Sequence, residues 1–155
     1  MLHISILCIG KTNEAYVQEG ISKYTKLLSK YCKFELTELP DVKNGNKLPP
    51  EKLKEAEALL IQSYMNERTA ILFLDETGKQ FSSEKFADYF QRKSTEYSKI
   101  MLVIGGSYGL SESIKQKGES ISLSAMTFNH QMVRVILAEQ LFRAFTIIHG
   151  TGYHH

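Results

Sequence analysis

The sequence predicts an α/β fold in which a mostly parallel β-sheet is flanked by helices. Segments with the composition of strands alternate along the chain with segments of helical periodicity, as they do in proteins built from βα units. Two of the strand segments, Thr69–Leu74 and Ile100–Ile104, are short and continuously apolar. Such runs are typical of strands in the middle of a parallel sheet, where helices cover both faces.

The first strand and helix are expected near the N-terminus. Leu2–Ile9 is rich in β-branched and apolar residues, which indicates a buried strand. A helix is predicted to follow down to about Ser29, with Thr12 or Asn13 capping its first turn. Cys32–Leu39 alternates between polar and apolar residues and is predicted to be the second strand.

A loop over residues 41–50 precedes the next helix, which the pair Pro49-Pro50 is expected to start. The helical spacing of apolar residues predicts an inner face made of Leu53, Ala56, Leu60 and Tyr64. The mixed charges on the same helix predict a solvated outer face made of Glu51, Lys52, Lys54, Glu55 and Glu57.

The second half of the chain continues the alternation of strands and helices. The apolar strand Thr69–Leu74 is expected to end in a turn over residues 75–79. The remaining elements are predicted to be a helix from Ser82 or Ser83, the strand Ile100–Ile104, a short helix over 110–117, a strand over 119–123 and a helix over 129–149.

Size and composition predict one domain over residues 1–155, with no membrane-spanning segment. The net charge of +2 is too small to indicate nucleic-acid binding and leaves room only for a local basic patch. Cys8 and Cys32 lie in apolar strand-like segments, so we expect reduced thiols and a cytoplasmic protein. The five histidines have no cysteine or carboxylate partners at ligand spacing, so no metal site is expected.

Small residues follow several of the predicted strands. Because ligands of parallel α/β sheets bind at the carboxyl ends of the strands, the loops after Leu74, Ile104 and Ser122 are candidates for a single site. Gly105–Gly109 has the spacing GGxxG instead of the dinucleotide pattern GxGxxG, and Gly10–Thr12 lacks the earlier glycine of a P-loop. The glycine pair is equally compatible with a tight turn and with close approach of a ligand.

The last helix is too apolar to lie on the surface. His130 and Arg134 fall close together on one side of it, and Glu139 and Arg143 fall roughly opposite. Two narrow polar stripes with apolar flanks predict a helix that is covered on two sides, by the sheet and by a second subunit. Glu139 and Arg143 are four residues apart and are expected to form an ion pair.

Several separate motifs together resemble the RlmH family of SPOUT methyltransferases, formerly called YbeA. They are Leu74-Asp75 with Gly78-Lys79, Val103–Gly109, Ser122–Phe128, His130–Arg134 with Glu139–Ala144, and Gly150 with Tyr153-His154. The match covers the full length, and the combined pattern is specific although each piece alone is weak. The chain departs from the family where it has Thr151-Gly152, since proline often stands just before the tyrosine.

The resemblance implies a parallel α/β sheet with a C-terminal trefoil knot, and a homodimer with its site near the subunit interface. It also implies S-adenosylmethionine-dependent methylation of N3 of a pseudouridine in large-subunit (23S) ribosomal RNA, within the ribosome. The cofactor-binding positions that the resemblance carries over are Leu74, Gly105, Leu123, Ser124, Ala125, Met126, Thr127 and Phe128.

Methyl transfer from a sulfonium depends mainly on positioning, and loss of the N3 proton calls for a general base. We therefore expect the tail residues Tyr153 and His154 to close over the cofactor, with His154 as the proton acceptor. Arg134 and Arg143 are candidates either for contacts with RNA phosphate or the pseudouridine edge, or for interface salt bridges. Arg134 is also a candidate catalytic residue, with Tyr153 and His154. Two alternative functions remain open: a catalytically silent ribosome- or RNA-binding module of the same fold, and a SPOUT methyltransferase that acts on transfer RNA.

Overall fold

The computed structural model describes residues 1–155 and contains one five-stranded sheet in the order β2-β1-β4-β3-β5. Every neighbouring pair of strands is parallel, as the sequence predicts. The strands are β1 His3–Ile9, β2 Lys33–Leu39, β3 Thr69–Gln80, β4 Lys99–Val103 and β5 Glu119–Ser122. The helices are α1 Ala15–Leu28, α2 Pro50–Gln62, α3 Ser83–Glu96, α4 Glu112–Lys115 and α5 Met132–His149, with a 3₁₀ turn at Gly45–Lys47.

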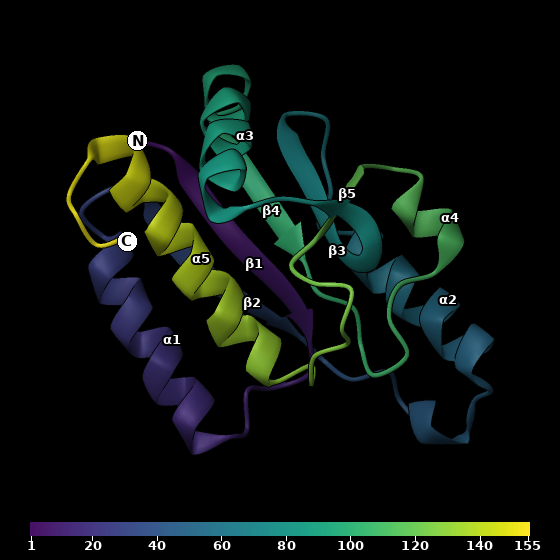
Figure 1. The fold of residues 1–155 in the computed structure, drawn as a ribbon. Coiled ribbons are helices and arrows are strands. Elements are labelled where there is room, and N and C mark those ends of the chain that lie inside the picture. The colour runs from purple at the N-terminus through teal and green to yellow at the C-terminus, as the bar shows by residue number, and fades with distance from the viewer.

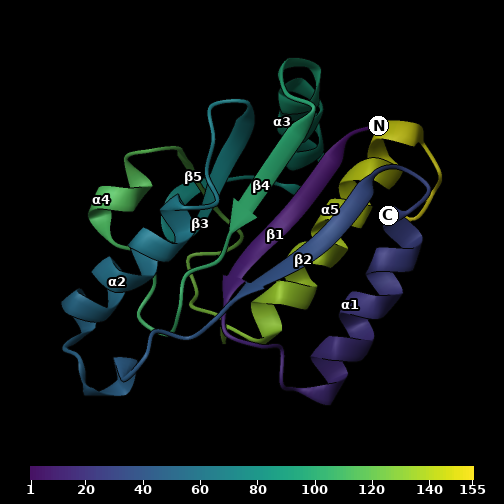
Figure 2. The same ribbon diagram turned by 180° about the vertical axis from the view of Figure 1, so that it is seen from behind.

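Helices cover both faces of the sheet, as Figures 1 and 2 show from opposite sides. Successive residues of a strand point to opposite faces, so Ile6 packs in one apolar cluster and Leu7 in the other. The first cluster lies beneath α1, α3 and α5, and the second lies beneath α2 and α4. None of the helices combines the length and the apolar composition that a membrane crossing requires.

Helix α5 packs between α1 and α3 on its face of the sheet (Figure 1). Gly20 of α1 allows this close packing, because a Cβ atom at that position would lie 2.4 Å from Cγ2 of Val135. The expectation that only the sheet and a second subunit remain to cover α5 was therefore wrong. The two neighbouring helices bury much of its apolar surface within the chain.

The segment predicted as a turn after Leu74 belongs to β3. This strand pairs with β5 through Leu74, and pairs again from Lys79 after an irregularity in register. The intervening residues 75–78 leave the regular pairing and form a bulge. Their sequence, Asp-Glu-Thr-Gly, has the composition of a turn, which is why the prediction was wrong. Gly78 lies so close to β5 that a Cβ atom there would be 2.7 Å from the carbonyl carbon of Ser120.

Two details of the helices also differ from the predictions. Helix α1 begins after Glu14 and has no side-chain cap. The Asn13 amide instead donates to Gln131, just before α5, and the Thr12 hydroxyl accepts from Arg134 of α5. Helix α2 begins at Pro50 as expected, but its buried residues are Glu57, Ala58 and Ile61. Glu57 was assigned to the solvated face, and that assignment was wrong because its side chain points inward with Ile61.

We expect Gly78→Ala to lower the free energy of unfolding by about 2 kcal/mol or more, because the added methyl group must displace main-chain atoms of β5. Chemical denaturation of the purified variant measures this loss. Thr77→Ala is the matched control, since Thr77 is an exposed residue of the same bulge. Equal stability of the two variants would contradict the close approach of β3 and β5.

Candidate active site

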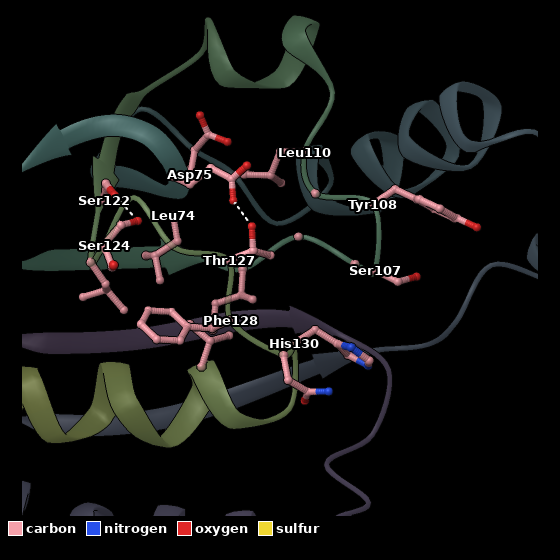
Figure 3. A pocket seen from close by; sticks show the side chains of 18 of the residues that line it. Leu74, Asp75, Ser107, Tyr108, Leu110, Ser122, Ser124, Thr127, Phe128 and His130 are labelled. Atoms are coloured by element: carbon pink, nitrogen blue, oxygen red, sulfur yellow. Dashed lines mark hydrogen bonds between the residues drawn. The ribbon is translucent and has the colours of Figure 1, made fainter.

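A cleft of about 460 Å³ opens at the carboxyl ends of the strands. This volume lies within the range of small-molecule and cofactor sites. Its walls come from β3, from the loop after β4, from α4 and from the loop between β5 and α5 (Figure 3). The three loops that the sequence singled out therefore meet at one site, as expected from the parallel order of the strands.

The structure brings seven of the eight predicted cofactor-binding residues to this cleft. They are Leu74, Gly105, Leu123, Ser124, Met126, Thr127 and Phe128. Ala125 belongs to the same loop but is exposed and does not line the cleft. Asp75, Lys115 and His130 line the cleft as well. Of these three residues, Lys115 lies outside the loops and motifs that the sequence singled out.

The loop after β4 presents main chain to the cleft. Gly106 and Gly109 form an antiparallel bridge, in which the Gly109 amide donates to the Gly106 carbonyl over 3.0 Å. A Cβ atom on Gly105 would lie 2.7 Å from the carbonyl carbon of Gly109, and Gly109 has a φ of 83°. The turn therefore requires these glycines, and their missing side chains leave backbone groups open to a ligand. The tight-turn interpretation of the glycine pair is confirmed, and close approach of a ligand stays a prediction.

Short side chains hold the loop between β5 and α5 in place. The hydroxyl of Ser122 donates to the carbonyl of Ser124 over 2.8 Å, and the Ser124 hydroxyl accepts from the Met126 amide over 3.0 Å. Thr127 donates to the carboxylate of Glu76 over 2.5 Å and so joins this loop to the bulge of β3 (Figure 3). The side chain of Met126 is left 76% exposed at the mouth of the cleft.

A lysine between two carboxylates forms the charged part of the wall. Lys115 of α4 lies 2.9 Å from Glu112 and 3.4 Å from Asp75 of the β3 bulge. The hydrogen bond with Glu112, aided by Asp75, raises the pKa of the Lys115 ammonium group. The lysine therefore links α4 to β3 through two charged contacts.

Arg134 does not reach the cleft, and the expectation that it contacts RNA or takes part in catalysis is corrected by its burial. Its side chain is 1% exposed. Nη1 and Nη2 donate to the carbonyls of Gly10 and Ile9 over 2.9 and 2.8 Å, and Nη1 also donates to Thr12 over 2.8 Å. Every nitrogen of the guanidinium group is occupied within the chain, since Nε donates to the carbonyl of His130.

The tail residues Tyr153 and His154 lie at the opposite end of α5 from the cleft. The 18 residues of α5 separate the two ends by roughly 27 Å. His154 contacts Glu84 through Nε2 over 2.8 Å and Arg143 through Nδ1 over 3.0 Å. Arg143 also forms the expected ion pair with Glu139, at 2.5 Å. The tail of this chain is therefore held away from the cleft of the same chain.

One buried carboxyl group near the site was missed. Glu57 is 6% exposed, and burial, aided by Asp41, raises the pKa of its carboxyl group to about 7. Its spacing of four residues from Ile61 was the available signal. Because glutamate is usually solvated, Glu57 was assigned to the outer face of α2.

Comparison with known proteins identifies the family. The family model described as predicted SPOUT methyltransferase matches residues 2–154. The chain belongs to the SPOUT methyltransferases. A ribosomal RNA large subunit methyltransferase H from Flavobacterium johnsoniae is 45% identical over 156 residues, and one from Christiangramia forsetii is 44% identical over 154 residues. A Bacillus cereus protein of the same name is 45% identical over 163 residues. Each alignment covers at least 98% of both chains.

Membership of the SPOUT methyltransferases agrees with the position of the cleft. These enzymes in general use S-adenosylmethionine, and the cleft offers exposed backbone groups, short hydroxyl side chains and the apolar Leu74, Leu123 and Phe128. Such a lining suits a ligand with a flat base, a sugar and an amino-acid chain. The residues that suit the methyl donor therefore come from the loops at the carboxyl ends of the strands.

We expect Arg134→Met to lower the free energy of unfolding by about 3 kcal/mol, because it leaves the carbonyls of Ile9 and Gly10 without their buried donor. Urea denaturation measures this change. Arg68→Met is the matched control, since Arg68 is exposed. Native stability of Arg134→Met combined with a loss of methyl transfer would restore a catalytic role for Arg134.

The Glu57 carboxyl group predicts a pH dependence of stability. Below its usual pKa of 4.5 the group is neutral in both folded and unfolded chains, and between pH 4.5 and about 7 only the unfolded chain ionises. The native protein therefore loses stability as the pH rises through this window. The free energy of unfolding of Glu57→Gln minus that of the native protein should therefore rise by about 2 kcal/mol from pH 5 to pH 8. A constant difference across this range, measured by urea denaturation, would rule this out.

Proposed function

We propose that this protein transfers a methyl group from S-adenosylmethionine to N3 of a pseudouridine in large-subunit (23S) ribosomal RNA. The observation that carries the proposal is the cleft at the carboxyl ends of the strands, whose walls include Leu74, Gly105 and residues 122–128. The names of the full-length relatives, ribosomal RNA large subunit methyltransferase H, support ribosomal RNA as the substrate. The position of the methylated atom rests on the family resemblance.

The cofactor, when bound, supplies an electrophilic methyl group. The residues of this chain would hold it through the main chain of the Gly105–Gly109 loop and through the loop of residues 122–128. Methyl transfer needs an in-line approach of the nucleophile, so the contribution of the protein is mainly to fix the two reactants. The exposed Tyr108 and Met126 at the mouth of the cleft are suited to contact a base that is turned out of its stack.

We propose a homodimer in which the tail of one subunit serves the cleft of the other. The separation of roughly 27 Å along α5 keeps Tyr153 and His154 from the cleft of their own chain. The half-buried apolar residue Ile136 and the 40% exposed Met132 give α5 a surface for the partner. His154 is the proposed proton acceptor, and it must then give up its Nδ1 contact with Arg143.

Four further points complete the proposal. Residues 1–155 form one SPOUT domain, since strands from both halves of the chain join in a single sheet. The segment after β4 forms the trefoil knot of the family. A ribosomal substrate implies a cytoplasmic location. The exposed lysines Lys11, Lys43 and Lys47, together with Lys79 near the end of β3, are proposed to contact RNA phosphate.

Incubation of the protein with methyl-labelled S-adenosylmethionine and ribosomes from a strain that lacks the gene tests the substrate. We expect label in large-subunit RNA and, after digestion and mass spectrometry, one N3-methylpseudouridine. Label in transfer RNA alone would establish the transfer RNA alternative. Absence of S-adenosylmethionine binding in calorimetry would favour the catalytically silent binding module.

We expect His154→Ala to lower kcat by about 100-fold, because a general base contributes on that order. Steady-state methylation of ribosomes measures the change, and His155→Ala is the adjacent control. A dimer that combines one His154→Ala subunit with one Gly105→Val subunit tests the exchange of tails. Activity of this mixed dimer supports transfer of the tail to the partner, since neither subunit has both an intact cleft and an intact tail. An inactive mixed dimer would contradict that arrangement.

A further inference from the structure

Glu57 is a buried carboxyl group with no partner. Its Oε1 atom is buried and makes no hydrogen bond with any group of the chain. The residue lies on α2 at 6% exposure, and its carboxyl group faces the glycine loop after β4. A Cβ atom on Gly106 would lie 2.4 Å from Oε2 and 2.8 Å from Oε1, so the carboxyl group rests directly against the main chain of Gly106.

No cation of the chain neutralises this group. Lys54, three residues earlier on the same helix, forms its ion pair with Glu51 at 3.0 Å. Lys115 of α4 is held by Glu112 and Asp75. Burial of the Glu57 carboxyl group is the main reason why its pKa is raised to about 7. The negative charge of Asp41, in the loop after β2, raises it further. Uncompensated buried charge is rare in proteins, so a missing positive charge calls for an explanation.

The same loop lines the cleft. Gly105, Gly106 and Gly109 are among the lining residues and Glu57 is not, so Glu57 contacts the loop without itself lining the cleft. An ionised carboxyl group that contacts a loop of the cleft favours a positively charged ligand over an otherwise similar neutral one. S-adenosylmethionine carries such a charge on its sulfonium, and the product S-adenosylhomocysteine does not.

We propose that Glu57 is a specificity-determining residue, which favours the cationic methyl donor over its neutral product through the glycine loop. The inference rests on the proposed use of S-adenosylmethionine. In the reaction the S–CH₃ bond breaks with its electron pair left on sulfur, an N–CH₃ bond forms at N3, and the N3 proton passes to the base. The sulfonium thereby becomes a neutral thioether. The attraction to Glu57 is lost at that moment, which promotes release of the product.

Calorimetric titration with S-adenosylmethionine and with S-adenosylhomocysteine tests the proposal, at pH 6 and at pH 8. In the native protein the ratio of the two affinities should shift toward the sulfonium by about fivefold as Glu57 ionises across this range. In Glu57→Gln the ratio should stay constant. Glu55→Gln is the matched control, because it removes a carboxylate from the exposed side of the same helix and should behave like the native protein.

A second readout in the same titrations is the number of protons exchanged. At pH 6.5, binding of the sulfonium should release protons from native Glu57, and the release should be smaller in Glu57→Gln and with the thioether. A ratio that is independent of pH in the native protein, or that changes equally in Glu57→Gln, overturns the inference while leaving the proposed function intact. A native protein that binds neither compound contradicts the proposed function itself.

Discussion

The buried guanidinium group of Arg134 is the interaction on which the geometry of the site depends. It joins the first turn of α5 to the carbonyl groups at the end of β1, while Gln131 joins the same region to Lys11 and Asn13. The loop of residues 122–128 is therefore anchored at both ends, by β5 and by the end of β1. A loop rich in short polar side chains has little apolar surface with which to order itself, so these anchors decide its shape.

The bulge of β3 supplies the second support. Because residues 75–78 leave the regular ladder, Asp75 and Glu76 project toward the cleft and reach Lys115 and Thr127. Two walls that lie far apart in the sequence are thereby tied to one strand. A regular strand would have pointed one of these carboxylates to the other face of the sheet.

The order of apolar and periodic segments was enough to predict a parallel α/β sheet and the three loops that form the cleft. The burial of Glu57 and Arg134 was not predicted, because a charged side chain is most often solvated. Only the three-dimensional contacts show which charged side chains are buried. The bulge escaped for a related reason, since Asp75–Gly78 has the composition of a turn. The position of Tyr153 and His154 depends on the length and direction of α5, which local patterns do not set relative to a site.

Helix α5 connects the wall of the cleft at one end with the tail at the other. Its length therefore determines where the tail lies relative to the cleft. One inserted residue would rotate everything beyond it by about 100° and shift it by about 1.5 Å. If the insertion lies in the first half of α5, such a change would separate Phe142 from Tyr24 of α1 and His154 from Glu84 of α3, even if the cleft stayed intact. The loop after β2 faces no such demand, because its residues 43–48 are mostly exposed and connect elements on the surface. Variation in chain length among related proteins should therefore gather in that loop and avoid α5.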